Sequence, residues 1–148
     1  MVDLHGIKIA VDFDGTIVEH AYPEIGKEKL FAFQTLKELN RMGASLILWT
    51  FRTGKELDEA VEFCRMNGVE FYAVNRNYPE EVFDETISRK INADIYIDDK
   101  NIGGFPGWSE VYQMINPFEL QQMAAEKRIA STGNIFRRLF GRKDKKNE

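Results

Sequence analysis

The chain has 148 residues, of which 43% are hydrophobic and 30% charged, and it carries a formal net charge of −4. This length suits one domain with a single core, and the composition excludes disordered, collagen-like and coiled-coil proteins. No apolar run approaches the roughly 20 residues that a membrane-spanning helix needs, and the first residues, MVDLHGIK, show no signal-peptide pattern. A single cysteine, Cys64, cannot form an internal disulfide, so the sequence predicts a cytoplasmic protein with a buried thiol.

Four short apolar runs are typical of buried strands. The predicted strands are residues 7–11 (IKIAV), 45–49 (SLILW), 69–74 (VEFYAV) and 93–97 (ADIYI). Between and after them, apolar residues recur at helical spacing, and glycines or prolines mark several helix ends. The predicted helices are residues 27–43, 54–68, 79–90 and 108–115.

Strands that alternate with helices predict a mainly parallel central sheet with right-handed crossover connections and helices on both faces. The predicted fold is therefore a Rossmann-like three-layer α/β sandwich. In such sheets, ligands bind beyond the carboxyl ends of the strands. All four predicted strands are followed there by polar residues: Asp12 and Asp14, Thr50 and Arg52, Asn75 and Arg76, and Asp98 and Asp99.

Four aspartates, Asp12, Asp14, Asp98 and Asp99, are expected to converge at this edge of the sheet. Crowded carboxylates raise one another's pKa unless a cation neutralises them. A ligand set made only of oxygen suits a hard divalent ion, and a shell shared between a few carboxylates and water suits Mg²⁺. We therefore predict a Mg²⁺ site at the tips of the first and fourth strands.

A metal site alone gives no reason for the donors Thr50, Arg52 and Lys90, whereas a phosphoryl group does. Its transfer needs donors and positive charge around the non-bridging oxygens, and a nucleophile in line with the leaving group. Asp12 can attack phosphorus to form an aspartyl phosphate, and Asp14 can protonate the leaving oxygen and later deprotonate water. Thr50 and Lys90 are predicted to hold the phosphoryl oxygens. Arg52 is left open between a phosphate or substrate clamp and a structural salt bridge.

These residues fall into four motifs in a fixed order: DFDGT (12–16), LILWT (46–50), Lys90 and IYIDD (95–99). In this order they resemble the four motifs of the haloacid dehalogenase-like superfamily, and the resemblance covers residues 7–104. It implies a Rossmann-like core and a Mg²⁺-dependent phosphatase or phosphomutase that acts through an aspartyl phosphate. It also implies individual roles: Asp12 as nucleophile and metal ligand, Asp14 as acid/base that lends its backbone carbonyl to the metal, Thr50 and Lys90 as phosphoryl ligands, and Asp98 and Asp99 as metal ligands.

Two assignments stay open. Arg89 and Lys100 flank the same region as Lys90, which we prefer as the phosphoryl ligand. Asp98 and Asp99 are adjacent, so the sequence leaves open whether the turn after the strand directs one or both of them at the metal. We prefer Asp98 as the direct ligand, with Asp99 bound directly or through water.

Members of that superfamily usually carry a cap domain in one of two intervals between the motifs. Here 33 residues lie between Thr16 and Thr50, and 39 lie between Thr50 and Lys90. Predicted loops, helices and strands already fill both intervals. We therefore predict a capless catalytic domain over residues 1–117, with a site that is open or is closed by a second copy of the chain. The loop 17–26 is predicted to be an ordinary exposed loop or a small flap whose His20 and Tyr22 touch the leaving group.

Residues 118–148 are predicted to form a helical, basic tail. Residues 127–148 carry a net charge of +6, which leaves −10 on the rest of the chain. Apolar residues between 135 and 140 predict that the tail packs on the domain and ends in a frayed, charged tip. Contact with anionic lipid, nucleic acid or a neighbouring subunit is the alternative.

The predicted function is hydrolysis of a phosphomonoester by a Mg²⁺-dependent phosphatase. An open site also allows a macromolecular substrate, either a nucleic-acid end or a phosphoprotein, although the acidic body lacks the basic track that nucleic acid needs. A catalytically idle binding module is the alternative from another class. The intact set of Asp12, Asp14, Thr50 and Asp98 argues against it.

Overall fold

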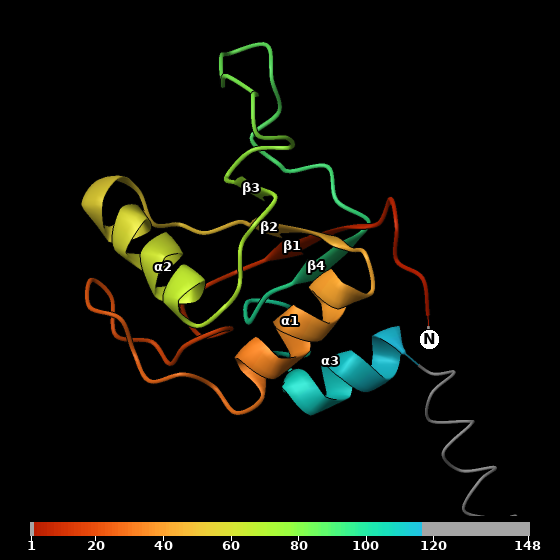
Figure 1. Cartoon of the computed structure of the whole chain (residues 1–148). Coiled ribbons are helices and arrows are strands. Elements are labelled where there is room, and N and C mark those ends of the chain that lie inside the picture. The colour runs from red at the N-terminus through yellow and green to blue at the C-terminus, as the bar shows by residue number, and fades with distance from the viewer. Residues whose placement is uncertain (1, 117–148) are drawn as a thin grey trace, which may run out of the picture. The chain divides into compact units, whose positions relative to one another are not determined.

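The computed structural model describes residues 2–116, whose centre is a four-stranded, all-parallel sheet (Figure 1). The strands follow the spatial order β3-β2-β1-β4. The elements are β1 (Lys8–Val11), α1 (Ala32–Arg41), β2 (Ser45–Leu48), α2 (Gly54–Met66), β3 (Ala73–Val74), β4 (Ile95–Ile97) and α3 (Trp108–Ile115). This arrangement confirms the predicted Rossmann-like α/β fold class.

Asp3–Tyr112 form one compact unit, and the site described below lies within it. A second unit joins Met1–Val2 to Gln113–Glu148, of which the structure describes Val2 and residues 113–116. The predicted boundary after residue 117 and the predicted basic tail over 118–148 therefore lie outside the described residues. Among residues 2–116, no helix has both the length and the apolar composition needed to cross a membrane.

β1 occupies the centre of the sheet, because it pairs with β2 on one side and with β4 on the other. Ile9 is in register with Leu46 and Ile95, and Ile9, Ala10 and Val11 are buried. Burial of both faces explains the continuous apolar run of this strand. Each fully buried Ile or Val stabilises the fold by roughly 1.5–3 kcal/mol.

Three phenylalanines join two helices to the turn that follows β1. Phe33 of α1 and Phe63 of α2 have ring centroids 5.7 Å apart, and Phe63 meets Phe13 edge-on at 6.4 Å. Phe13 lies between Asp12 and Asp14 in the sequence and is completely buried. This packing therefore fixes the turn that carries both aspartates.

A second apolar cluster draws on Ala10, Ile47 and Ala73, which lie in register on neighbouring strands. Ile91 packs against them from the segment between β3 and β4. β3 itself is confined to two residues and is shorter than the strand predicted over 69–74. The irregular chain that precedes β4 therefore contributes to the core at this point.

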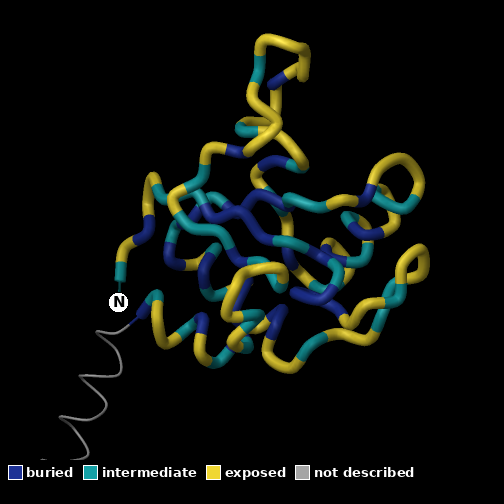
Figure 2. Tube along the Cα trace, turned by 180° about the vertical axis from the view of Figure 1, so that it is seen from behind, coloured by how far each residue is buried: buried dark blue, intermediate teal, exposed yellow. Residues whose placement is uncertain are grey.

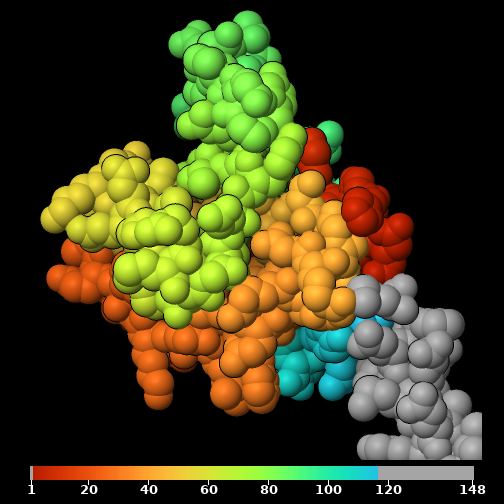
Figure 3. All heavy atoms as spheres, viewed as in Figure 1, coloured from red at the N-terminus to blue at the C-terminus, as the bar shows by residue number. Residues whose placement is uncertain are grey.

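Residues 79–90 form turns and bends instead of the predicted helix. Short-range hydrogen bonds explain the difference, because Glu81 accepts the backbone N–H of Asn77 at 2.7 Å and Asp84 accepts that of Thr86 at 2.8 Å. Side-chain bonds of this kind compete with the backbone pairing of a helix. Figures 2 and 3 show this segment standing out from the sheet, largely exposed.

The helix predicted over 27–43 begins later, at Ala32. The residues before it are tied back to the loop after β1, because Lys29 donates its backbone N–H to the carbonyl of Ile17 at 2.9 Å. Phe31 then takes a left-handed φ of 65° where the helix begins. Four apolar residues recur at three-residue steps in the predicted helix, and the three that lie within α1, Phe33, Leu36 and Leu39, are buried. The fourth, Leu30, precedes α1 and is 77% exposed.

Candidate functional site

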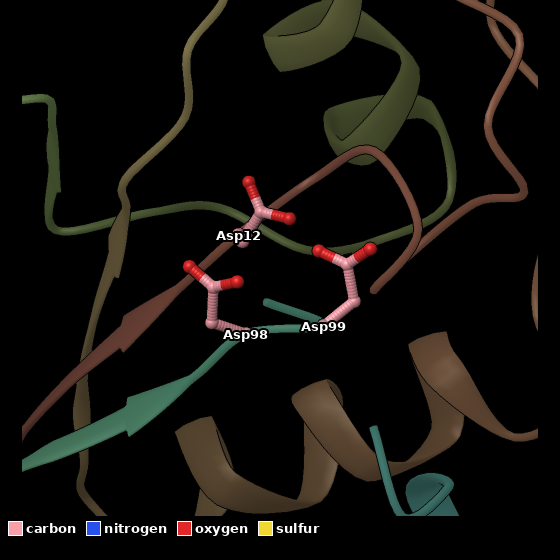
Figure 4. A group of neighbouring side chains, drawn as sticks. All are labelled: Asp12, Asp98 and Asp99. Atoms are coloured by element: carbon pink, nitrogen blue, oxygen red, sulfur yellow. The ribbon is translucent and has the colours of Figure 1, made fainter. Parts of the chain in front are cut away.

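Three aspartates meet at the carboxyl ends of β1 and β4 (Figure 4). Val11 and Ile97 pair in register, so Asp12 and Asp98 leave the sheet side by side. One carboxylate oxygen from each of Asp12, Asp98 and Asp99 lies within 4.8 Å of the other two. The fold therefore brings together the aspartates of the first and fourth strands.

The Asp12 carboxylate is largely buried among like charges. Burial is the main cause that raises its pKa to about 7, and the charges of Asp98 and Asp99 add to the effect, against hydrogen bonds from Phe13 and Thr16. The Thr16 hydroxyl donates to Asp12 Oδ2 at 3.0 Å. A divalent cation would offset both the burial and the repulsion. Three carboxylates fit such an ion, because carboxylate oxygens are the ligands that hard cations prefer.

The turn after β4 holds Asp98 and Asp99 in place. Asp98 Oδ1 accepts the backbone N–H of Lys100 at 2.7 Å. Asp99 Oδ2 lies 2.8 Å from His20 Nε2 and 3.6 Å from Lys100 Nζ. Burial raises the pKa of Asp99, but the contacts with His20 and Lys100 outweigh burial and leave its pKa below the ordinary value. Asp99 is therefore held as a carboxylate, and His20 of the loop 17–26 belongs to the site.

Gly15 makes the approach of His20 to Asp99 possible. Its φ of 85° is a left-handed conformation that glycine adopts without strain. A Cβ at this position would lie 2.3 Å from Asp99 Oδ2 and 2.4 Å from His20 Nε2. Any side chain here would both strain the turn and separate the His20–Asp99 pair.

Asp14 forms a bidentate ion pair with Arg52. Arg52 Nε lies 2.7 Å from Asp14 Oδ2, and Nη2 lies 2.8 Å from Oδ1. The same guanidinium donates to the carbonyls of Pro23 at 2.9 Å and Glu24 at 2.7 Å, and its side chain has no exposed surface. The hydrogen bond to Asp14 raises the pKa of Arg52.

Of the two roles left open for Arg52, the structure therefore shows the salt bridge. The guanidinium lies behind Asp14 and ties that carboxylate to the loop 17–26, so it does not present itself to a ligand. The expected role of Arg52 in substrate binding is corrected accordingly. Sequence spacing could not separate the two roles, since both place an arginine shortly after Thr50.

Asn75 fixes the loop that carries Thr50. Its Oδ1 accepts the Thr50 N–H at 2.8 Å, and its Nδ2 donates to the carbonyl of Arg52 at 3.3 Å. Thr50 Oγ1 accepts the Arg52 N–H at 3.2 Å and still has its own hydrogen to donate. Sequence analysis missed this role of Asn75, because an asparagine after a strand also suits a turn for backbone reasons alone.

These residues surround one cavity of about 550 Å³. Its lining combines acidic groups, donors and aromatic rings: Asp12, Asp14, His20, Tyr22, Trp49, Thr50, Phe51, Asp98, Asp99 and Lys100. Five of the predicted site residues therefore share a single space. Two segments far apart in the sequence, the loop 17–26 and the turn after β4, meet there.

One solved structure, described as that of a conserved protein coded by a locus from Bacteroides thetaiotaomicron, is similar to this chain. The two are 56% identical over 75% of this chain and 90% of that chain, with a TM-score of 0.71. This chain belongs to the same family as that conserved protein. No protein-family model and no curated protein matches the chain.

Lys90 is placed differently from the expectation. Its Nζ lies 5.2 Å from the ring centroid of Tyr96, whereas the lysine that lines the cavity, among the described residues, is Lys100. The segment before β4 is irregular and carries the Lys90 side chain onto the Tyr96 ring, so the role of Lys90 as a phosphoryl ligand stays a prediction. The sequence indicates a place for Lys100 at the site, because Lys100 directly follows Asp99, shortly after a predicted strand.

Proposed function

We propose that the protein is a phosphomonoester phosphatase of the haloacid dehalogenase-like type that uses Mg²⁺ and forms an aspartyl phosphate on Asp12. The observation that supports this proposal best is the convergence of Asp12, Asp98 and Asp99 in one cavity with Thr50 and Lys100. The motifs DFDGT, LILWT and IYIDD, which supply Asp12, Thr50, Asp98 and Asp99, support the same reaction class.

Asp12, Asp98 and Asp99 would hold the divalent ion, with the backbone carbonyl of Asp14 as the further ligand that the family resemblance implies. When bound, Mg²⁺ supplies positive charge that neutralises the carboxylates and the phosphoryl oxygens. Bound Mg²⁺ also favours the ionised form of Asp12, whose pKa is about 7 without a cation. An ionised Asp12 is the form that can act as a nucleophile.

In the proposed first step, a carboxylate oxygen of Asp12 attacks phosphorus and the bond from phosphorus to the ester oxygen breaks. The leaving oxygen takes a proton from Asp14. In the second step, Asp14 takes a proton from a water molecule that attacks phosphorus, and the bond from phosphorus to Asp12 breaks. Inorganic phosphate leaves, and Asp12 is regenerated.

The donors of the cavity suit the phosphoryl oxygens. The Thr50 hydroxyl keeps a hydrogen to donate, because it accepts the Arg52 N–H instead of donating to it. The Lys100 ammonium is exposed and lies 3.6 Å from Asp99 Oδ2, where a phosphoryl group beside the three aspartates would meet it. The bidentate pair with Arg52 uses one acceptor site on each oxygen of Asp14, so a further lone pair stays available for proton exchange while the pair holds the side chain in place.

Purified protein with Mg²⁺ is expected to hydrolyse a generic aryl phosphate. Asp12→Asn is expected to lower kcat by at least about 10³-fold, because the nucleophile is removed. Asp58→Asn is the matched control, since Asp58 is exposed on α2 and outside the cavity. Activity that survives Asp12→Asn or EDTA would contradict the mechanism. Tight binding of Mg²⁺ without turnover of any phosphoester would favour a binding module instead.

A further inference from the structure

Three aromatic residues line the cavity. Tyr22, Trp49 and Phe51 line it beside the acidic groups, and we call these three residues the aromatic wall. Phe51 directly follows Thr50 and is 92% exposed, and Tyr22 is 52% exposed. The rings of Tyr22 and Phe51 meet edge-on, with centroids 6.5 Å apart. Two large rings thus face water at the mouth of a phosphoryl-type cavity.

Arg52, which is buried, and Tyr96, which is partly buried, pack against two rings of the aromatic wall. The Arg52 guanidinium lies 5.2 Å from the Tyr22 ring centroid and donates to the carbonyl of the next residue, Pro23, at 2.9 Å. Trp49 packs on Tyr96, with centroids 5.5 Å apart. These contacts hold two of the three rings in fixed places, which lowers the entropy that a ligand would otherwise lose on ordering them.

The backbone of Phe51 is fixed as well. Asn75 accepts the N–H of Thr50 on one side of it and donates to the carbonyl of Arg52 on the other. Exposure to water does not stabilise the Phe51 ring, and the fixed loop presents its flat apolar face to a planar partner. Stacking on such a face removes apolar area from water on both partners.

The volume of the cavity also exceeds what a phosphoryl group needs. About 550 Å³ is within the range of pockets that enclose drug-sized molecules. The three aspartates and the donors Thr50 and Lys100 share the lining of the cavity with the three rings of the aromatic wall. The part of the cavity that a phosphoryl group does not fill is therefore lined by the aromatic wall, which favours an apolar or planar leaving group over a charged one.

We propose that the substrate is a phosphomonoester whose leaving group carries a planar aromatic ring, which lies against Phe51 and Tyr22 while the phosphoryl group lies beside Asp12. This inference rests on the proposed phosphatase function and names its substrate class. Two kinds of molecule have this chemistry, nucleoside monophosphates and phosphates of phenyl-bearing alcohols, and the experiment below separates them.

The test compares substrates in pairs that differ in the ring alone. A nucleoside 5′-monophosphate is paired with ribose 5-phosphate, and 2-phenylethyl phosphate with 2-cyclohexylethyl phosphate, so that each pair has a similar leaving oxygen. For at least one pair, the ring-bearing member is expected to have a kcat/KM about tenfold or more above its partner, in line with the strength of base–aromatic stacking. The pair with the larger ratio identifies the kind of ring.

Phe51→Leu and Tyr22→Leu are each expected to reduce that ratio about tenfold, mainly through KM. Phe83→Leu is the matched control, because Phe83 is an exposed ring outside this cavity. Equal turnover within both pairs, or an equal effect of Phe51→Leu on both members, would overturn the inference and leave the phosphatase proposal standing. Failure of the wild-type protein to hydrolyse any of the four substrates would overturn both.

Discussion

Two polar regions of the molecule, the candidate site and residues 79–90, differ in how far apart in the sequence their hydrogen-bond partners lie. At the candidate site some partners are distant in sequence, as in the pair of Asp14 and Arg52, 38 positions apart. In residues 79–90 the partners are local, as in the pair of Asn77 and Glu81, four positions apart. Long-range bonds form only when the chain has folded, whereas local bonds form wherever the backbone turns. The comparison teaches that the geometry of the site depends on the folded chain, whereas the turns of residues 79–90 are held by neighbours in the sequence.

The first prediction breaks the bidentate ion pair between Asp14 and Arg52. Arg52→Met is expected to lower the free energy of unfolding by about 3–5 kcal/mol, because it leaves the partly buried Asp14 without its cation and the carbonyls of Pro23 and Glu24 without their donor. Arg65→Met is the matched control: Arg65 pairs with Glu62 three positions away on α2, and both are largely exposed. The control is expected to cost at most about 1 kcal/mol.

Urea unfolding of both variants measures the difference. Arg52→Met is also expected to reduce turnover, since Asp14 and the loop 17–26 lose their common anchor. A loss of stability no greater than that of Arg65→Met would show that the long-range pair at the site is no more important than a local pair on a helix.

The second prediction concerns the Asp12 carboxylate, which lies close to those of Asp98 and Asp99. In protein without metal, the raised pKa of Asp12, about 7 against an ordinary 3.8, means that the folded state binds a proton more tightly than the unfolded state does. Stability is therefore expected to fall as the pH rises from about 4 through about 7, by about 2–4 kcal/mol. Asp12→Asn is expected to remove this decline. Urea unfolding in EDTA across that pH range measures it, and parallel pH profiles for the two proteins would contradict it.

The third prediction adds the cation to the same site. Mg²⁺ at a hundredfold excess over its Kd is expected to stabilise the wild-type protein by about 2.7 kcal/mol. Because the ion competes with a proton on Asp12, its affinity is expected to rise with pH and to level off above about 7. Asp98→Asn is expected to lose most of the stabilisation, and Asp58→Asn to retain it. Titration followed by thermal unfolding measures both, and equal stabilisation of all three proteins would argue against the site.

Whether a feature depends on residues near or distant in the sequence also decides whether it could be predicted from the sequence. The meeting of Asp12 and Asp98 was predictable, because the carboxyl ends of parallel strands share one edge and both residues directly follow a strand. The helices 54–68 and 108–115 were predictable from apolar spacing, and the structure contains both. These inferences need only the period of a local pattern and the topology of a parallel sheet.

The features that were missed depend on tertiary contacts. The position of Lys90 follows from the irregular path of the chain before β4, where local hydrogen bonds replace a helix that the apolar spacing had favoured. The burial of Arg52 depends on backbone carbonyls of the loop 17–26, which no residue pattern reveals. The hydrogen bond between His20 and Asp99 joins residues 79 positions apart, and it needs the space left by Gly15.

The last prediction sharpens the comparison at Asn75, where one side chain serves both a turn and the site. Asn75→Gly keeps the left-handed φ of 51° free of strain but removes the two hydrogen bonds to the loop that carries Thr50. It is expected to lower the free energy of unfolding by about 1 kcal/mol and to reduce kcat more than it raises KM, because Thr50 is no longer held in place. Asn75→Asp is the matched variant, since it retains the acceptor for the Thr50 N–H and loses the donor to Arg52. If Asn75→Gly loses stability but turns over substrate as the wild-type protein does, Asn75 serves the turn alone; if Asn75→Asp recovers the turnover, the acceptor for Thr50 is the part that matters.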